Sequence, residues 1–332
     1  MVGRTNSRSV WGNDWAKYGA PMDPKVQPLS QYDIDSIIRG VAPGGQLVAA
    51  DRLEGGVSAT VTYLEFELPD GTSRRVIVRQ YGLFDLAGNP GVAMHEEALL
   101  EILVQQGLPV PEPLLSETGF GEAGWTWLVA GFIEGTTITE PPFPERFAEQ
   151  IAETLTSIHA VDPTLSDLAF LPDGHDQAAM QIEANVQSSH LSTDEHGYWH
   201  ALETRWPSAP AEPRSLLHGD FWPGNLIWKD GKIAGVIDWE DARLGHPLED
   251  VANCRLELYL SGGAELADAF SDTYGRLRSD AGYDRLRLWE LYVAARLNGR
   301  IARWGLEPGE EAAMRQRVEA FASEALRQLT AS

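Results

Sequence analysis

The stretch LHGDFWPGNLIWKDGKIAGVID, residues 217–238, decides the fold of this 332-residue chain. It opens with His218 and Asp220, and Asn225 follows five residues after the aspartate. The Asp-Gly pair at 230–231 is a strong signal for a two-residue hairpin turn, which predicts strands at residues 226–228 and 233–237. Asp238 then ends the second strand. Two aspartates and one asparagine are therefore expected at the ends of two antiparallel segments.

These residue types at this spacing fit phosphoryl transfer. One carboxylate must orient the attacking hydroxyl and accept its proton, while an amide oxygen and a second carboxylate hold the magnesium that bridges the nucleotide phosphates. The spacing H-x-D-x-x-x-x-N is that of a kinase catalytic loop. A lone aspartate would be interpreted as a turn or capping residue. The combination of His218, Asp220, Asn225 and Asp238 disfavours a hairpin with incidental polar residues.

Two departures from the protein-kinase pattern are informative. Gly219 stands where protein kinases carry arginine, and Asp-Trp-Glu at 238–240 replaces D-F-G. His-Gly-Asp followed by Ile-Asp-Trp resembles the aminoglycoside phosphotransferase family, which with its choline-kinase-like relatives phosphorylates small molecules. The resemblance implies an α+β, bilobal protein-kinase-like fold, with a small β-rich N-lobe of five strands and a larger, mostly helical C-lobe.

The resemblance also implies roles for the residues of this stretch. Asp220 would be the catalytic base or would position the acceptor hydroxyl, and Asn225 and Asp238 would bind Mg²⁺. His218 would order the loop without doing chemistry. Asp250 would cap a helix and brace the catalytic loop.

Upstream, a glycine turn is expected to cover the nucleotide phosphates. Gly55, Gly56 and Ser58 lie between apolar segments, and glycines let backbone N–H groups approach an anion closely. A Gly-Gly pair by itself is usually only a turn. The family's Gly-Gly-x-Ser run at this distance from the N-terminus favours the phosphate-covering role.

Arg79 ends a predicted strand where kinases carry the lysine that contacts the phosphates. Arginine keeps the charge but presents a planar donor fork, and it resembles many members of the family at this position. Glu96, in the first turn of a helix predicted over 94–106, is assigned as its partner, with Glu97 as the alternative. Acidic residues there are also favoured by the helix dipole alone, and Arg79 could be a surface arginine.

Further site residues follow from the resemblance. Gly131, Phe132 and Ile133 leave a predicted strand where the family has the hinge whose backbone binds the nucleobase. Glu240 and Asp241 are candidates for acceptor binding, although acidic residues near a loop are usually only solvated. The domain boundaries expected are a polar arm over 1–30, a nucleotide-binding N-lobe over 31–130, and a C-lobe over 131–332 with the catalytic, metal and acceptor residues.

Composition restricts the partners. With 26 basic and 49 acidic residues the net charge is −23, which argues against nucleic-acid and anionic-membrane binding. The same charge favours a cationic acceptor, with solubility as the equal alternative. The single cysteine excludes an internal disulfide, and neither an apolar transmembrane run nor a signal-peptide centre is found, so a cytoplasmic location is expected.

The sequence therefore predicts a kinase that transfers the γ-phosphoryl group of ATP or GTP to a hydroxyl of a small acceptor, in the presence of Mg²⁺. The alternative is a catalytically silent nucleotide-binding module, supported only by Arg79 in the lysine position. A protein kinase is disfavoured because the chain has neither D-F-G nor A-P-E.

Overall fold

The computed structural model describes residues 28–53, 59–120, 125–189, 191–208, 213–304 and 306–331. These residues form two compact units that are not contiguous in sequence. Unit 1 contains the described residues of Met1–Thr137 with Gly224–Asp230 and Ala234–Glu240. Unit 2 contains the described residues of Ile138–Pro223, Gly231–Ile233 and Asp241–Ser332.

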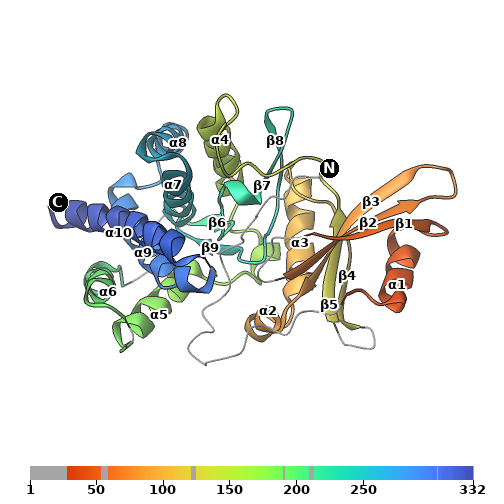
Figure 1. The fold of residues 1–332 in the computed structure, drawn as a ribbon, viewed down its shortest axis with the longest axis horizontal. Coiled ribbons are helices and arrows are strands. Elements are labelled where there is room, and N and C mark those ends of the chain that lie inside the picture. Colours follow the sequence, from red (N-terminus) through yellow and green to blue (C-terminus); the bar gives the residue numbers. More distant parts are fainter. Residues whose placement is uncertain are drawn as a thin grey trace. The chain divides into compact units, whose positions relative to one another are not determined.

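Unit 1 is built on a five-stranded antiparallel sheet (Figure 1) with the strand order β1-β2-β3-β5-β4. The strands are β1 Gln46–Leu53, β2 Ala59–Glu67, β3 Ser73–Tyr81, β4 Pro113–Phe120 and β5 Trp125–Gly131. Successive side chains of a strand point to opposite faces of the sheet. On β3, Val76 and Val78 therefore face the hydrophobic core. Arg79 and Tyr81 lie at alternate positions, on the opposite face of the strand.

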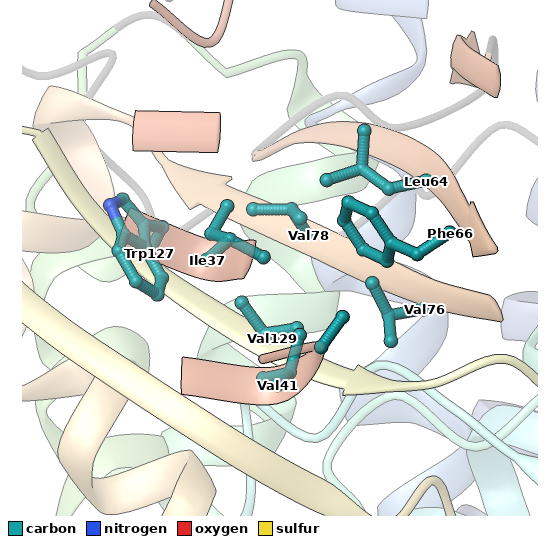
Figure 2. Packing of buried hydrophobic residues seen from close by; sticks show 9 residues of the cluster. Ile37, Val41, Leu64, Phe66, Val76, Val78, Trp127 and Val129 are labelled. Atoms are coloured by element: carbon teal, nitrogen blue, oxygen red, sulfur yellow. The ribbon is translucent and has the colours of Figure 1, made fainter. Parts of the chain in front are cut away.

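Helix α1, Gln31–Val41, closes the hydrophobic core of unit 1. Figure 2 shows Ile37 and Val41 of this helix next to the valines of β3 and β5. The helix begins at a capping box: the Ser30 hydroxyl accepts a hydrogen bond from the Asp33 N–H, and the Asp33 carboxylate accepts one from the Ser30 N–H. Serine is among the residues most favoured at such a cap, so the sequence itself indicates where this helix begins.

Helix α3, Val92–Gln105, packs against β4 and β5. Leu99, Leu100 and Leu103 are buried on its apolar face, as the spacing predicts. Glu96 is also buried, with only 5% of its surface exposed. A buried carboxyl group needs polar partners, and those of Glu96 include Arg79 and Tyr81 of β3. The short helix α2, Leu83–Gly88, precedes α3.

The predicted hairpin is confirmed. Strand β7, Leu226–Lys229, pairs with β8, Lys232–Val236, and a 3₁₀ turn over Pro223–Asn225 precedes them. At the turn, Asp230 has a φ of 50° and Gly231 a φ of 73°. Two consecutive left-handed residues define the type I′ turn that matches the twist of a hairpin, which is why Asp-Gly is favoured there.

Unit 2 is mostly helical (Figure 1). Its helices are α4 Phe147–His159, α5 Gly174–Val186, α6 Thr193–Arg205, α7 Leu248–Gly262, α8 Ala264–Leu277, α9 Leu286–Asn298 and α10 Pro308–Ala331, with 3₁₀ turns at Ser166–Leu168, Tyr283–Arg285 and Ile301–Trp304. Helix α7 packs against α8 and α9, and α10 packs against α9. Strands β6, Ser215–Leu217, and β9, Arg243–Gly245, form a short antiparallel pair. Within the described ranges, no helix has the length and apolar character needed to cross a bilayer.

Glu257 on α7 yields a prediction about pH. Its Oε1 atom is buried and has no hydrogen-bond partner among the described residues, and burial raises the pKa of Glu257 from 4.5 to about 7. A raised carboxyl pKa means that the folded state binds the proton more tightly than the unfolded state. The charged form of Glu257 therefore destabilises the fold. This destabilisation is zero below pH 4.5, grows as the pH rises to about 7, and stays constant at higher pH.

We expect Glu257→Gln to raise the free energy of unfolding by about 2–3 kcal/mol at pH 8 and by little at pH 4.5. Urea denaturation at both pH values measures this difference. Glu319→Gln, at an exposed position of α10, is the matched control and should change the free energy by less than about 0.5 kcal/mol at either pH. Equal effects of Glu257→Gln at the two pH values would contradict the assignment.

Candidate active site

The segment that carries Asp220 is held by its backbone. In unit 2, the N–H groups of His218 and Gly219 donate to the two carboxylate oxygens of Asp250 at 2.7 and 3.0 Å. The Asp220 N–H donates to Nδ1 of His218 at 3.3 Å. The side chains of His218, Asp220 and Asp250 are all buried. Two charge-assisted hydrogen bonds to one carboxylate therefore determine where the chain turns before Asp220.

Gly219 allows a close backbone approach. It has a φ of 85°, and a Cβ at this position would lie 2.1 Å from the carbonyl oxygen of Asp241. A side chain is thus disfavoured both by the left-handed backbone and by the lack of space. This is the physical reason that glycine replaces the arginine of the protein-kinase pattern.

Arg243, which the sequence analysis did not single out, contacts both of the backbone segments that meet at Gly219. Its guanidinium donates to the carbonyl oxygen of Asp241 at 2.8 Å and to that of Gly219 at 3.3 Å. The same guanidinium forms a buried ion pair of 2.6 Å with Glu249. Burial alone would lower the pKa of Arg243, but the Glu249 carboxylate outweighs it and raises the pKa. The signal available in the sequence was an arginine six residues before a glutamate, in the segment that follows Asp238.

Asp250 is itself supported by a buried network. Nε2 of His159 lies 3.2 Å from Oδ2 of Asp250, and Nδ1 of His159 lies 2.7 Å from the hydroxyl of Tyr274. Burial opposes the charged form of Asp250, yet the hydrogen bond with His159 and the nearby basic groups lower its pKa overall. Asp250 therefore remains ionised and keeps both loop hydrogen bonds. His159, at the end of α4, thus contacts the carboxylate that holds the loop.

In unit 1, the hairpin places Asn225 and Asp238 on neighbouring segments. The Ile237 N–H donates to the carbonyl oxygen of Asn225 at 3.0 Å. Asp238 has a φ of 73°, which is unusual for any residue other than glycine. Strained backbone of this kind persists only where the surroundings impose it, and it is concentrated at functional sites. Trp239 secures the turn through its indole N–H, which donates to the carbonyl oxygen of Val236 at 3.0 Å.

Arg79 is the centre of an ion-pair cluster in unit 1, which we call the Arg79 cluster: Arg79, Glu96, Asp238 and Glu240. One terminal nitrogen of Arg79 lies 2.7 Å from Asp238 and 3.4 Å from Glu96, and the other lies 2.7 Å from Glu240. Burial would lower the pKa of Arg79, but the charges of the three carboxylates outweigh it and raise the pKa well above its ordinary value. Arg79 is therefore a permanent cation beside the carboxylate of Asp238.

The partner assigned to Arg79 is Glu96, and the structure places the two side chains within ion-pair distance. The hydroxyl of Tyr81 also donates to Glu96 at 2.7 Å, a contact that the sequence did not reveal. The alternative, Glu97, instead accepts a hydrogen bond from the Ser116 hydroxyl. Because Glu96 and Glu97 are adjacent on a helix, they point to different neighbours.

Of the three expected hinge residues, Gly131 ends β5, and Phe132 and Ile133 follow it. The Gly131 N–H donates to the carbonyl oxygen of Glu112 at 2.8 Å, and the Phe132 N–H donates to that of Arg75 at 3.2 Å. The Phe132 ring contacts Tyr63 edge-on, with 5.1 Å between centroids. Ile133 packs where Gly235 leaves room, since a Cβ on that glycine would lie 2.4 Å from the Ile133 side chain.

The predicted site residues thus divide between the units. Unit 1 brings together Arg79, Glu96, Asp238 and Glu240, and it also holds Asn225 and the hinge residues. Unit 2 holds the others, which are His218, Asp220, Asp241 and Asp250. Gly55, Gly56 and Ser58, like most of the arm over 1–30, lie outside the described residues. No group of three or more His, Cys, Asp or Glu side chains in the described part of the chain has the geometry of a metal site.

Comparison with known proteins identifies the family of the chain. Residues 50–289 match the family model described as the phosphotransferase enzyme family. The chain belongs to this phosphotransferase family. A thermostable mutant of an aminoglycoside phosphotransferase, solved as a ternary complex with ADP and hygromycin B, superposes with a TM-score of 0.60 at 17% identity, covering 90% of this chain and 98% of that one. The likeness confirms the predicted α+β protein-kinase-like fold.

Two curated relatives are similar to this chain over part of their length. Acyl-CoA dehydrogenase family member 11 of Gallus gallus is 29% identical over 165 residues, which cover 45% of this chain and 21% of that protein. Viomycin phosphotransferase of Streptomyces vinaceus is 26% identical over 161 residues, which cover 45% of this chain and 56% of that protein. The chain spans about a fifth of the length of the first of these relatives.

The crowding at Gly219 gives a prediction with an internal control. Gly219→Ala places a methyl group against the Asp241 carbonyl, so we expect a loss of at least about 3 kcal/mol in the free energy of unfolding. Gly231→Ala has a similar positive φ of 73° but meets nothing within 4 Å, so only the backbone strain of about 1–2 kcal/mol remains. Denaturant unfolding of both variants measures the difference, and equal losses would show that the close approach is not what requires glycine.

The Arg79 cluster gives a second prediction. Arg79→Gln leaves three partly buried carboxylates without their cation, so we expect a destabilisation of about 3 kcal/mol. Adding Glu240→Gln to that variant should recover about 1 kcal/mol, because one uncompensated charge is removed. Arg75→Gln on the same strand is the control: its 3.9 Å pair with Glu134 is exposed and should contribute less than about 1 kcal/mol. Thermal and denaturant unfolding of the wild type and the three variants measure these differences. If the double variant recovers no stability, Glu240 is not a partner of Arg79.

Proposed function

We propose that this protein is a small-molecule kinase that transfers the γ-phosphoryl group of ATP or GTP to a hydroxyl group of a small acceptor. The observation that carries the proposal is the set of Asp220, Asn225 and Asp238 on a braced loop and a hairpin, in a member of the phosphotransferase enzyme family. An aminoglycoside phosphotransferase that shares the fold was solved with ADP and hygromycin B, and a curated relative is a viomycin phosphotransferase.

Asp220 is proposed to orient the acceptor hydroxyl and accept its proton. Its support is positional, because the preceding N–H groups are held by Asp250 and the Asp220 N–H by His218. A group that is fixed in this way loses little conformational entropy during the reaction. Such a loss would otherwise add to the activation barrier. His218 acts as a positioning residue and not as an acid or base.

Asn225 and Asp238 are proposed to hold Mg²⁺. An amide oxygen and a carboxylate are the hard oxygen ligands that this ion takes together with phosphates and water. The left-handed backbone of Asp238 supports the assignment, since it gives this carboxylate a direction that an ordinary strand residue would not have. When bound, the ion would neutralise charge on the phosphates.

Arg79 is proposed to steady the phosphates, with Glu96 holding its guanidinium. The glycine turn at Gly55, Gly56 and Ser58 would cover the same phosphates. At the hinge, the N–H groups of Gly131 and Phe132 already donate within unit 1. The nucleobase would therefore be bound through carbonyl oxygens of this segment or through the main chain of Ile133.

The acceptor is proposed to carry an amine, because the net charge of −23 attracts cations. Of the two acidic candidates, Glu240 is an ion-pair partner of Arg79, whereas Asp241 lies in unit 2, and its carbonyl oxygen faces Gly219. Both Glu240 and Asp241 are proposed as candidates for acceptor binding. Hydroxylated amines should be phosphorylated in preference to neutral sugars of similar size.

Asp220→Asn tests the reaction. We expect turnover with Mg²⁺, nucleotide and an acceptor panel to fall at least about a hundred-fold, since the proton acceptor is lost while the shape is kept. Nucleotide affinity, measured by titration calorimetry, should change little. Asp272→Asn, at an exposed position of α8, is the control and should retain full activity.

Two results would contradict the proposal. Full turnover by Asp220→Asn would refute the role of Asp220. Magnesium-dependent nucleotide binding by the wild-type protein, with no acceptor phosphorylated and only slow nucleotide hydrolysis, would instead favour the silent nucleotide-binding module.

A further inference from the structure

A pocket in unit 2 lies apart from the residues assigned to phosphoryl transfer. Gly245 and His246 line it at the end of β9, and Arg214 lines it just before β6. Ser215 pairs with Gly245, whereas Leu217 pairs with Arg243 at the other end of the same ladder, where the chain continues to Asp220. The pocket and Asp220 therefore lie at opposite ends of the β6–β9 pair. We call it the β9 pocket.

Aromatic rings form much of the lining. The rings of His175 and Trp206 are stacked, with 6.0 Å between centroids and 24° between planes. The rings of His246 and Trp289 are also stacked, at 5.8 Å and 28°. The two indoles then meet edge to face, at 4.9 Å and 75°. A flat group that enters the pocket would pack against the parts of these rings that line it.

His246 contributes a buried donor without an acceptor. Only 5% of the surface of His246 is exposed. Its Nδ1 accepts a hydrogen bond from the Leu248 N–H at 3.3 Å. In the neutral ring the proton is therefore on Nε2, and this buried atom has no partner among the described residues. Burial, together with the charge of Arg285, lowers the pKa of His246 to about 4, which keeps the ring neutral near pH 7. A buried donor that is left unpaired destabilises the fold, and a bound acceptor atom would remove that cost.

The other polar groups of the pocket are also mainly donors. The indole nitrogen of Trp206 is buried and unpaired within the described ranges. Arg285 is exposed at the pocket and forms no ion pair with a described residue. The carboxylate of Asp173 is neutralised by its 2.7 Å pair with Arg214. The pocket therefore offers N–H donors and net positive charge beside aromatic surfaces.

We propose that the β9 pocket binds an oxyanion, a carboxylate or a phosphate, carried on a planar group of a ligand. The oxyanion accepts hydrogen bonds from Nε2 of His246 and from Arg285, and the planar group packs against Trp206 and Trp289. Arginine is suited to both oxyanions because its donor fork matches their paired oxygens. The site needs neither nucleotide nor metal, and so it does not rest on the kinase function.

Binding of small aromatic probes to the full chain, without nucleotide or Mg²⁺, tests the proposal. Benzoate and phenyl phosphate carry the two oxyanions, while benzyl alcohol and benzylamine are neutral and cationic matches. Tryptophan fluorescence is a direct readout because two indoles line the pocket, and titration calorimetry gives the dissociation constants. We expect benzoate or phenyl phosphate to bind at least about ten-fold more tightly than benzylamine.

Two variants locate the binding. Arg285→Gln should weaken oxyanion binding about three- to ten-fold. His246→Asn should weaken it similarly, because asparagine can still accept the Leu248 N–H but has no donor at the Nε2 position. Arg327→Gln, at an exposed position of α10, is the control and should bind as the wild type does.

The result that overturns the proposal is equal affinity for the anionic, neutral and cationic probes, or unchanged benzoate and phenyl phosphate binding in Arg285→Gln. If His246→Asn does not fold, as judged by circular dichroism, the exposed Arg285 decides the outcome alone.

Discussion

The carboxylate of Asp250 is the constraint on which the segment around Asp220 depends. It accepts hydrogen bonds from two successive backbone N–H groups, those of His218 and Gly219, and a buried histidine supports it from behind. Unpaired N–H groups at this depth would each cost about 1–3 kcal/mol, so the carboxylate and the loop conformation require one another. Gly219 then admits the Asp241 carbonyl, and the guanidinium of Arg243 donates to the carbonyl oxygens of both Asp241 and Gly219. The position of Asp220 is a consequence of these contacts.

In unit 1, one cation serves three carboxylates. Arg79 contacts Glu96 from α3 and both Asp238 and Glu240 from the segment after the hairpin. A lysine ammonium is a compact point charge, whereas the planar fork of arginine can reach acceptors on two sides at once. The arginine at this position is therefore consistent with an intact site, and it connects the sheet, α3 and the hairpin.

Features that depend on neighbouring residues could be predicted from the sequence. The Asp-Gly turn, the Ser30 cap and the apolar face of α3 each follow from the requirements of a few consecutive residues. The fold class followed from a motif resemblance. Arg243, the contact of Tyr81 with Glu96 and the β9 pocket were missed because their partners are brought together only by the folded chain. Helices α5 and α6 were not predicted, because the many polar residues in their sequences obscure the helical period.

Net charge and local charge give different information about ligands. The net charge of −23 affects solubility and the long-range attraction of cations. This attraction falls off over a Debye length of about 10 Å in 0.1 M salt. Inside a pocket, the groups within hydrogen-bond reach outweigh that field, because water no longer screens them. The β9 pocket neutralises its one lining carboxylate and leaves Arg285 and the His246 N–H available. An acidic protein can therefore present a site for an anion, and the class of ligand has to be inferred from the pocket, not from the isoelectric point.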